Sequence, residues 1–423
     1  MRILVPALAI ATLALAGCGA KTGAALPDAS VRDAGAGMDG GMDATVRPLD
    51  AFVLPSDAAS ADAPRPDAEC DAGPVVLDAG GTPLVVDMLF VIDNSLSMQE
   101  EQRALAAQFP ALVRILATGD LDADGRADFE PVSDLQVGVV TTELWIGPYD
   151  LGCDLDPRDG ADGVLRTAGN WRDRSCADAY PRFLGYRPGE DDPEALARDF
   201  ACVSGVGTLG CGIEQPLEAA LKALAPADSP IEFLYGTGHG DELNEGFARE
   251  GSILAIVLVT DENDCSFADP ELFDPDSVRY PSPTGGSNGI ALRCFAYPEA
   301  LQPVSRYVDA FRALRPEPDS LVFAAVTGVP QDLVTDPDHL DYDGILDDPR
   351  MREAIDRAHP ERLLPACDVE GVGFALPSRR IVEVARELER ISVVQSICEE
   401  DFSGALTGIT GRLARVIRRR SCR

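Results

Sequence analysis

Positive charge is scarce in this sequence. Of its 423 residues, 36 are Lys or Arg and 71 are Asp or Glu, which gives a formal net charge of -35. Nucleic-acid affinity comes largely from Lys and Arg that neutralise phosphates, so we expect no nucleic-acid partner. The three histidines, His239, His339 and His359, leave little for a zinc site.

Motifs of the common hydrolases are also missing. The chain has no Gly-x-Ser-x-Gly, Walker or His-Glu-x-x-His pattern. Ser95 has no neighbouring base in the chain, and His239 lies in a loop without an evident nucleophile. We therefore expect that the protein is not an enzyme, with a hydrolase kept as the alternative.

An apolar run, Ile3 to Ala16, opens the chain and is too short to be a permanent membrane span. It ends Leu15-Ala16-Gly17-Cys18, which resembles the lipobox of bacterial lipoproteins. The resemblance implies that residues 1–17 are a signal peptide and that Cys18 is lipidated, an anchor of roughly 0.8 kcal/mol per buried methylene. Gly19 favours sorting to the outer membrane of the cell envelope. An ordinary secretory signal with a chance cysteine is the alternative.

The next segment, residues 18–84, is acidic and rich in Ala, Asp, Gly and Pro. Such a composition buries too little apolar surface to offset the entropy of ordering the chain. We expect a disordered tether that holds the following domain away from the membrane, or else a region whose length is not under selection.

Strand-like and helical runs alternate from residue 85 to the end, the pattern of a parallel sheet with crossover helices. We expect a doubly wound α/β domain over residues 85–423, with polar, Pro-rich insertions at the sheet edges near 145–207, 265–298 and 329–377. The expected strands are 84–92, 134–142, 252–260 and 321–328. The expected helices are 99–116, 214–225, 301–314, 379–389 and 402–419.

Polar residues follow two of the expected strands, where open α/β sheets bind their ligands. Asp93, Ser95 and Ser97 follow the first strand, Thr208 lies in a loop ahead of a helix, and Asp261 ends the strand 252–260. In order and spacing they resemble the metal-ion-dependent adhesion site of the von Willebrand factor type A (VWA) family. The common Gly between the two serines of that family is Leu96 here.

The VWA resemblance implies that these five residues bind Mg²⁺ or Mn²⁺. Mg²⁺ needs few protein oxygens and keeps several waters, so an open position would remain for a carboxylate of a protein or other macromolecular partner. The chain resembles the VWA lipoproteins of predatory and social soil bacteria, a myxobacterial type. A structural or sensory envelope module, in which metals only stabilise the fold, is the alternative function.

A second candidate metal site lies between the first helix and the second strand. Its acidic residues alternate as in the Ca²⁺ loop of calmodulin-like hands, with Gly125 at the sixth position, but Pro131 stands at the twelfth. We expect weak Ca²⁺ binding, or simply a solvated acidic loop. The loop positions are Asp120, Asp122, Asp124, Arg126 and Asp128.

Eleven cysteines in an exported chain predict disulfides, with Cys18 reserved for lipid. The sequence does not fix their connectivity. Short loops suggest Cys153 with Cys176, Cys202 with Cys211, and Cys265 with Cys294. Elimination leaves Cys367 with Cys398 and Cys70 with Cys422; free catalytic thiols are the alternative.

Overall fold

A six-stranded sheet lies at the centre of the domain, in the order β3-β2-β1-β4-β5-β8. The structure is a computed structural model that describes residues 83–149, 155–285, 289–317, 319–369, 372–400 and 402–421. All neighbours in the sheet are parallel except β2 and β3. The strands are β1 Val85–Ile92, β2 Asp134–Thr141, β3 Leu184–Tyr186, β4 Ile253–Thr260, β5 Leu321–Thr327 and β8 Ser392–Ser396.

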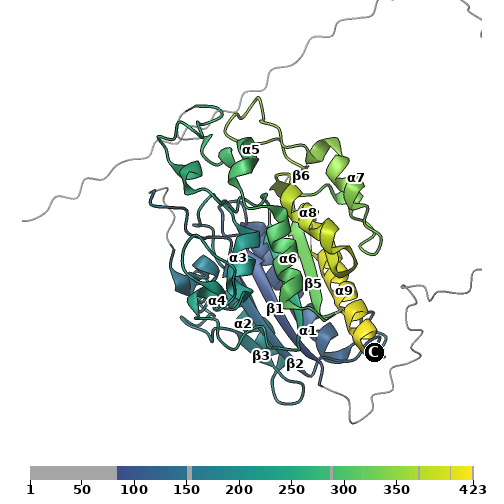
Figure 1. Cartoon of the computed structure of the whole chain (residues 1–423). Helices are drawn as coiled ribbons and strands as arrows, with labels where there is room; N and C mark the ends of the chain where they lie inside the picture. The colour runs from purple at the N-terminus through teal and green to yellow at the C-terminus, as the bar shows by residue number, and fades with distance from the viewer. Residues whose placement is uncertain are drawn as a thin grey trace, which may run out of the picture. The chain divides into compact units, whose positions relative to one another are not determined.

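Helices cover both faces of the sheet, so the domain has three layers (Figure 1). One face packs against α1 Gln99–Thr118, α2 Pro193–Ser204 and α9 Ser403–Ser421. The other packs against α3 Pro216–Leu224, α6 Val304–Leu314, α7 Tyr342–Asp347 and α8 Arg379–Leu388. The expected α/β fold with a mainly parallel sheet is therefore confirmed.

Short elements occupy the connections. They are the helices α4 Gly238–Asp241 and α5 Arg293–Ala296, the hairpin β6 Cys367–Val369 with β7 Gly373–Ala375, and 3-10 turns at Pro157–Asp159, Ala161–Gly163, Pro270–Phe273, Pro298–Ala300, Gln331–Leu333, Pro349–Met351 and Glu389–Ile391.

The central strand β1 is apolar because both of its faces are covered. Met88 and Phe90 contact the layer that holds α1, while Leu89 and Val91 contact the layer that holds α3. A strand buried on both faces needs a continuous apolar run rather than alternation, which is why the sequence identified it.

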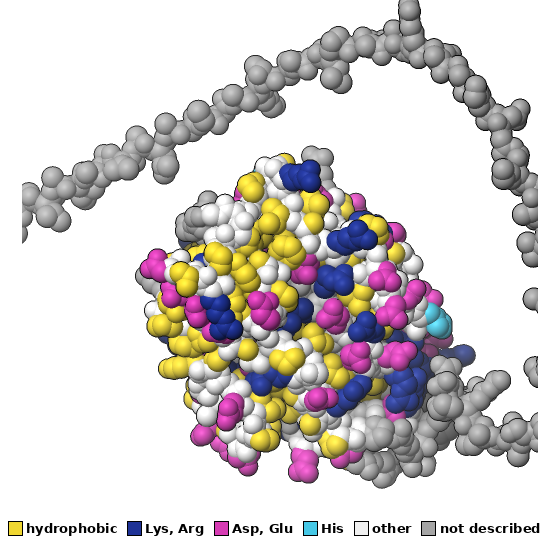
Figure 2. Space-filling model, turned by 45° about the horizontal axis from the view of Figure 1, so that its top comes forward, with side chains coloured by type: hydrophobic (Ala, Val, Ile, Leu, Met, Phe, Trp, Pro, Cys, Tyr) yellow, Lys and Arg dark blue, Asp and Glu magenta, His cyan; other side chains and the backbone are white. Residues whose placement is uncertain are grey.

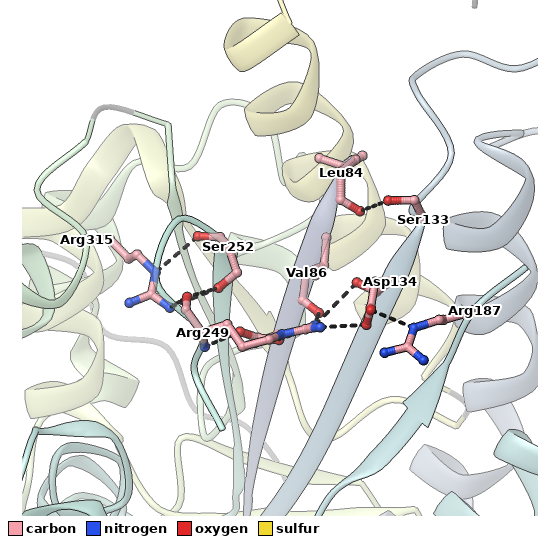
Figure 3. A network of polar contacts seen from close by, with 9 residues as sticks. Leu84, Val86, Ser133, Asp134, Arg187, Arg249, Ser252 and Arg315 are labelled. Atoms are coloured by element: carbon pink, nitrogen blue, oxygen red, sulfur yellow. Dashed lines mark hydrogen bonds and ion pairs between the residues drawn. The ribbon is translucent and has the colours of Figure 1, made fainter. Parts of the chain in front are cut away.

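Asp87 interrupts that run and is fully buried near the amino end of β1. Two nitrogens of Arg249 donate to it at 2.6 and 2.9 Å, and a third binds Asp134 of β2 at 2.6 Å. Arg315 in turn donates to the carbonyl of Arg249 at 3.0 Å, and Arg187 donates to Asp134 at 2.8 Å (Figure 3). This network joins β1, β2 and the chain before β4 at the sheet edge opposite Asp93.

The first predicted insertion, 145–207, is not confined to an edge loop. It supplies β3 and α2, and Phe200 of α2 is fully buried, with its ring 3.5 Å from that of Phe109. The expectation that this stretch lies outside the core was therefore wrong. Because this stretch is rich in polar residues, the narrow apolar face of the short helix α2 could not be recognised in the sequence. Strand β8 was also missed, since Ser392–Ser396 is too short to show a pattern.

Three disulfides join described residues, and two were predicted. Cys265 pairs with Cys294 and Cys367 with Cys398, as expected. The prediction for Cys176 and Cys202 was wrong because these two pair with each other. Packing decides this: the backbone of Asn170 donates to the carbonyl of Cys202 at 3.0 Å, which brings the loop of Cys176 against the end of α2.

Cys211 also forms a disulfide, although its predicted partner Cys202 pairs with Cys176. Cys153, the predicted partner of Cys176, lies outside the described residues. The predicted signal peptide, the lipidated Cys18, the tether before Pro83 and the pair Cys70 with Cys422 lie outside them as well. Among the helices that the structure does describe, none has the length and apolar character to cross a membrane.

Candidate metal centre

Two neighbouring strands bring Asp93 and Asp261 to the same edge of the sheet. β1 and β4 pair in parallel up to Ile92 and Val259, and Asp93 donates its N–H to the Val259 carbonyl at 2.9 Å. The hydroxyl of Thr260 donates to Asp93 Oδ2 at 2.6 Å. The chain continues from β1 to β2 on one side of this pair and from β4 to β5 on the other, so the two connections diverge here. Such a switch point is where α/β sheets bind ligands.

The two serines lie in the turn that follows β1. Ser95 donates its N–H to Asp93 Oδ1 at 2.7 Å, and the hydroxyls of Ser95 and Ser97 are 3.2 Å apart. The Ser97 side chain lies near enough to Asp261 to lower the pKa of that carboxyl, so the turn reaches the end of β4. Leu96 does not have a positive φ. Its place in the turn therefore does not require the glycine that VWA domains commonly have.

The loop that carries Thr208 is bonded to the same turn through Gln102 of α1. The Gln102 amide donates to the carbonyls of Asp93, at 2.9 Å, and Gly207, at 2.8 Å, and accepts from the Gly207 N–H at 3.2 Å. Gly210 donates its N–H to the Asn94 carbonyl at 2.9 Å. The structure thus gathers the turn after β1, the end of β4 and the Thr208 loop in one place.

A buried carboxylate braces the same loops. Glu143, which follows β2, accepts from the Asn94 side chain at 2.8 Å and from the Cys211 N–H at 2.6 Å. Neither Glu143 nor Gln102 was identified from the sequence. They act through tertiary contacts, and the sequence pattern gives no signal for either.

Three further glutamates crowd the two aspartates. Burial, with repulsion from Asp93 and other neighbours, raises the pKa of Glu262 to about 8, that of Glu101 to about 7 and that of Glu214 well above its ordinary value. Burial likewise raises the pKa of Asp93 and, together with repulsion from Asp93, that of Asp261. None of the salt bridges among the described residues involves any of these five carboxyls. Ionisation of these carboxyls would therefore concentrate uncompensated negative charge at this end of the sheet.

Some oxygens of this cluster are buried without a hydrogen-bond partner. They include Oδ1 of Asp261, which is 3% exposed, and Oε1 of Glu214, also 3% exposed. Buried polar atoms normally have partners, so each orphan needs a physical reason. For Asp261 a cation supplies one, because it compensates the charge and ligates the free oxygen. Hydroxyls with carboxylates fit Mg²⁺ or Mn²⁺ better than softer metals.

The outer rim of the centre is open and apolar. Leu96, beside the two serines, is 81% exposed, and Leu209, beside Thr208, is 78% exposed. Ser97 is exposed as well, whereas Ser95 and Thr208 are buried. A molecule that reached the site would meet two leucines.

The predicted Ca²⁺ loop connects α1 to β2, so it lies at the opposite end of the strands from the first centre. Carboxylate oxygens of Asp120, Asp122 and Asp124 lie within 4.8 Å of one another. Asp128 accepts from the Leu121 N–H at 2.9 Å and Gly125 donates to Asp120 at 3.0 Å, so the loop is closed on itself. Oδ1 of Asp120 is buried without a hydrogen-bond partner. Arg126 contributes its backbone N–H to Asp124 at 2.8 Å.

No protein-family model matches the chain, and no curated protein matches it in sequence. Among solved structures, proximal thread matrix protein 1 from the mussel byssus aligns at 11% identity with a TM-score of 0.26. The alignment covers 58% of this chain and 38% of that one. The chain thus spans less than half of the mussel protein, and the likeness is too slight to assign a fold or a function.

Proposed function

We propose that the chain is a VWA-type adhesion module that binds a macromolecular partner through a divalent cation. Asp93, Ser95, Ser97, Thr208 and Asp261 would hold Mg²⁺ or Mn²⁺, directly or through water. The ion would supply Lewis acidity toward an incoming carboxylate of the partner. The lipobox-like sequence at Cys18 supports a location in the cell envelope, with the module anchored to the outer membrane by lipid.

The orphaned oxygen of Asp261 is the observation that carries this proposal. It is buried beside the Ser97 hydroxyl and Asp93, and the described residues offer it no cation. A merely structural cluster would be expected to pair its charges, because a buried unpaired carboxylate costs several kcal/mol. An open ligand position is supported by the exposure of Ser97, Leu96 and Leu209.

The two exposed leucines also indicate which residues the partner should carry beside its carboxylate. A carboxylate that approaches the ion would pass between Leu96 and Leu209, so its neighbours should be apolar. Acidic and basic side chains are interspersed on the face drawn in Figure 2, without one large basic patch. The formal net charge of -35 also suits a protein segment better than a polyanion such as nucleic acid.

The test measures Mg²⁺ binding by calorimetry and partner capture from envelope extract, with and without chelator. We expect Asp261→Ala to abolish both, whereas Asp309→Ala, which removes an exposed carboxylate from α6, should change neither. Partner binding that persists undiminished in chelator contradicts the adhesion mechanism. Mg²⁺ binding without any chelator-sensitive partner would favour a structural module instead.

A further inference from the structure

A cavity of about 120 Å³ opens next to the candidate metal centre. Residues 212–214, ahead of α3, and residues 262–264, after β4, form one part of the wall, and the two later insertions form the rest. Leu292, Phe295 and Leu363 give those insertion walls an apolar lining. The volume is several times the roughly 10 to 15 Å³ that one water needs, so it admits the head of a side chain.

The arginines of this cavity are already engaged. Arg380 binds Asp264 at 3.1 Å and donates to the carbonyl of Gln302 at 2.7 Å. Arg362 lies over the ring of Phe374 at 4.7 Å and pairs with Asp356 at 3.4 Å. Neither guanidinium forms a salt bridge with the glutamates of the wall in the described part of the chain.

Those glutamates have acceptor capacity that the described residues do not use. Oε1 of Glu214 is buried without a hydrogen-bond partner, and Glu353 accepts a single bond from Asn263 at 2.9 Å. Glu262 adds a third carboxyl to the lining. The cavity therefore combines apolar walls with unmatched acceptors, a set that suits a cationic group on an apolar stem.

We propose that this cavity binds a Lys or Arg side chain of the partner. The inference rests on the proposed function, because the same partner would place its carboxylate on the cation of the neighbouring metal centre. A hydrated metal is a poorer occupant, since its waters would face Leu292, Phe295 and Leu363. The role of the two later insertions is then to recognise this basic residue, with the Cys265–Cys294 disulfide holding the wall that both cysteines line.

Butylguanidinium is the probe, and butylurea is its uncharged counterpart of similar shape. Both are titrated by calorimetry into the full chain with Mg²⁺ saturating. We expect saturable binding of butylguanidinium and at least about tenfold weaker binding of butylurea, because a charged hydrogen bond is lost. Glu353→Gln and Glu214→Gln should each weaken butylguanidinium about tenfold. Glu250→Gln, at an exposed position before β4, should not.

Equal binding of the two probes, or binding that Glu353→Gln leaves unchanged in a folded protein, overturns the proposal. Displacement of the probe by excess Mg²⁺ also overturns it, since the cavity would then hold an inorganic cation. Glu353 lies outside the metal centre, so this variant remains informative if Glu214→Gln does not fold. The probe has no carboxylate, so its result stands even where Asp261→Ala disproves the adhesion site.

Discussion

Gly210 has no room for a side chain. A Cβ atom there would lie 2.4 Å from the side chain of Asn94, which Glu143 holds in place. We expect Gly210→Ala to push apart the Thr208 loop and the turn after β1. Loss of such outer contacts commonly weakens metal binding by about tenfold or more. Calorimetry with Mg²⁺ measures this.

Gly212→Ala is the matched control for that change. A Cβ at Gly212 meets nothing within 4 Å, so this variant should bind Mg²⁺ as the wild type does. Equal Mg²⁺ affinity in both alanine variants would show that the Thr208 loop does not contribute to the site.

Arg249 is the residue whose loss should cost the most stability. Asp87 is fully buried and Arg249 is its ion-pair partner. Arg249→Met leaves that carboxylate uncompensated, so we expect the free energy of unfolding to fall by about 3 to 5 kcal/mol. Urea denaturation checks it. Arg187→Met removes a 58% exposed side chain from Asp134 and should lower the free energy of unfolding far less, because solvent screens exposed ion pairs. Similar losses in the two variants would contradict the buried-pair account.

At the scale of elements, the Asp120–Asp128 loop makes a separate prediction. If it binds Ca²⁺, a concentration about ten times the Kd adds about 1.4 kcal/mol to the free energy of unfolding. Asp122→Asn combined with Asp124→Asn should remove that gain, while Asp309→Asn should keep it. Urea midpoints measured in saturating Mg²⁺, with and without Ca²⁺, give the answer. A gain that survives the double variant rules out the loop.

The long elements were predictable from sequence and the short ones were not. Buried parallel strands such as β1 and β4 need unbroken apolar runs, and α1 shows a clear helical period. α2 lay hidden in a polar insertion, and its packing of Phe200 on Phe109 depends on residues 91 positions apart in the chain. The same limit applies to disulfides: Cys176 and Cys202 meet because the loop of Cys176 packs against the end of α2, and spacing in the sequence does not predict that contact.

The residues of the candidate site show the same limit, because a local pattern marks some of them and only tertiary contacts mark the others. Asp93 and Asp261 could be found because strand ends mark them, and Thr208 because its loop has the expected order. Gln102, Glu143 and Glu214 could not, since each acts through contacts made only after folding. The expected ligand set thus came from local pattern, whereas the bracing and the neighbouring cavity came from the tertiary structure.

For the whole molecule, the buried carboxyls predict how stability depends on pH without metal. The folded-state pKa is about 7 for Glu101 and about 8 for Glu262, both above the ordinary 4.5. Between the ordinary pKa and these raised folded-state values, the folded protein binds more protons than the unfolded chain. Stability must therefore fall as the pH rises through that range. Urea midpoints of metal-free protein should therefore be lower at about pH 8 than at about pH 5.

Saturating Mg²⁺ should reduce that fall, because the ion stabilises ionised carboxylates. Metal-free protein that is as stable at the higher pH would show that these carboxyls are already compensated.

Asp134 acts in the opposite sense: burial opposes its ionisation, but hydrogen bonds from Arg249 and Arg187 outweigh this and lower its pKa. Its contribution is lost only as the pH falls below its ordinary value of 3.8.

The course of β1 has a mechanical consequence. The described chain enters this strand at Val85, and the strand delivers Asp93 to the candidate site at its other end. Tension between the preceding residues and a ligand at Asp93 would run along the strand axis. Parallel neighbours on both sides, β2 and β4, would then resist through ladder bonds loaded together in shear rather than opened one by one. Pulled from these two points, the domain would resist with its central strand.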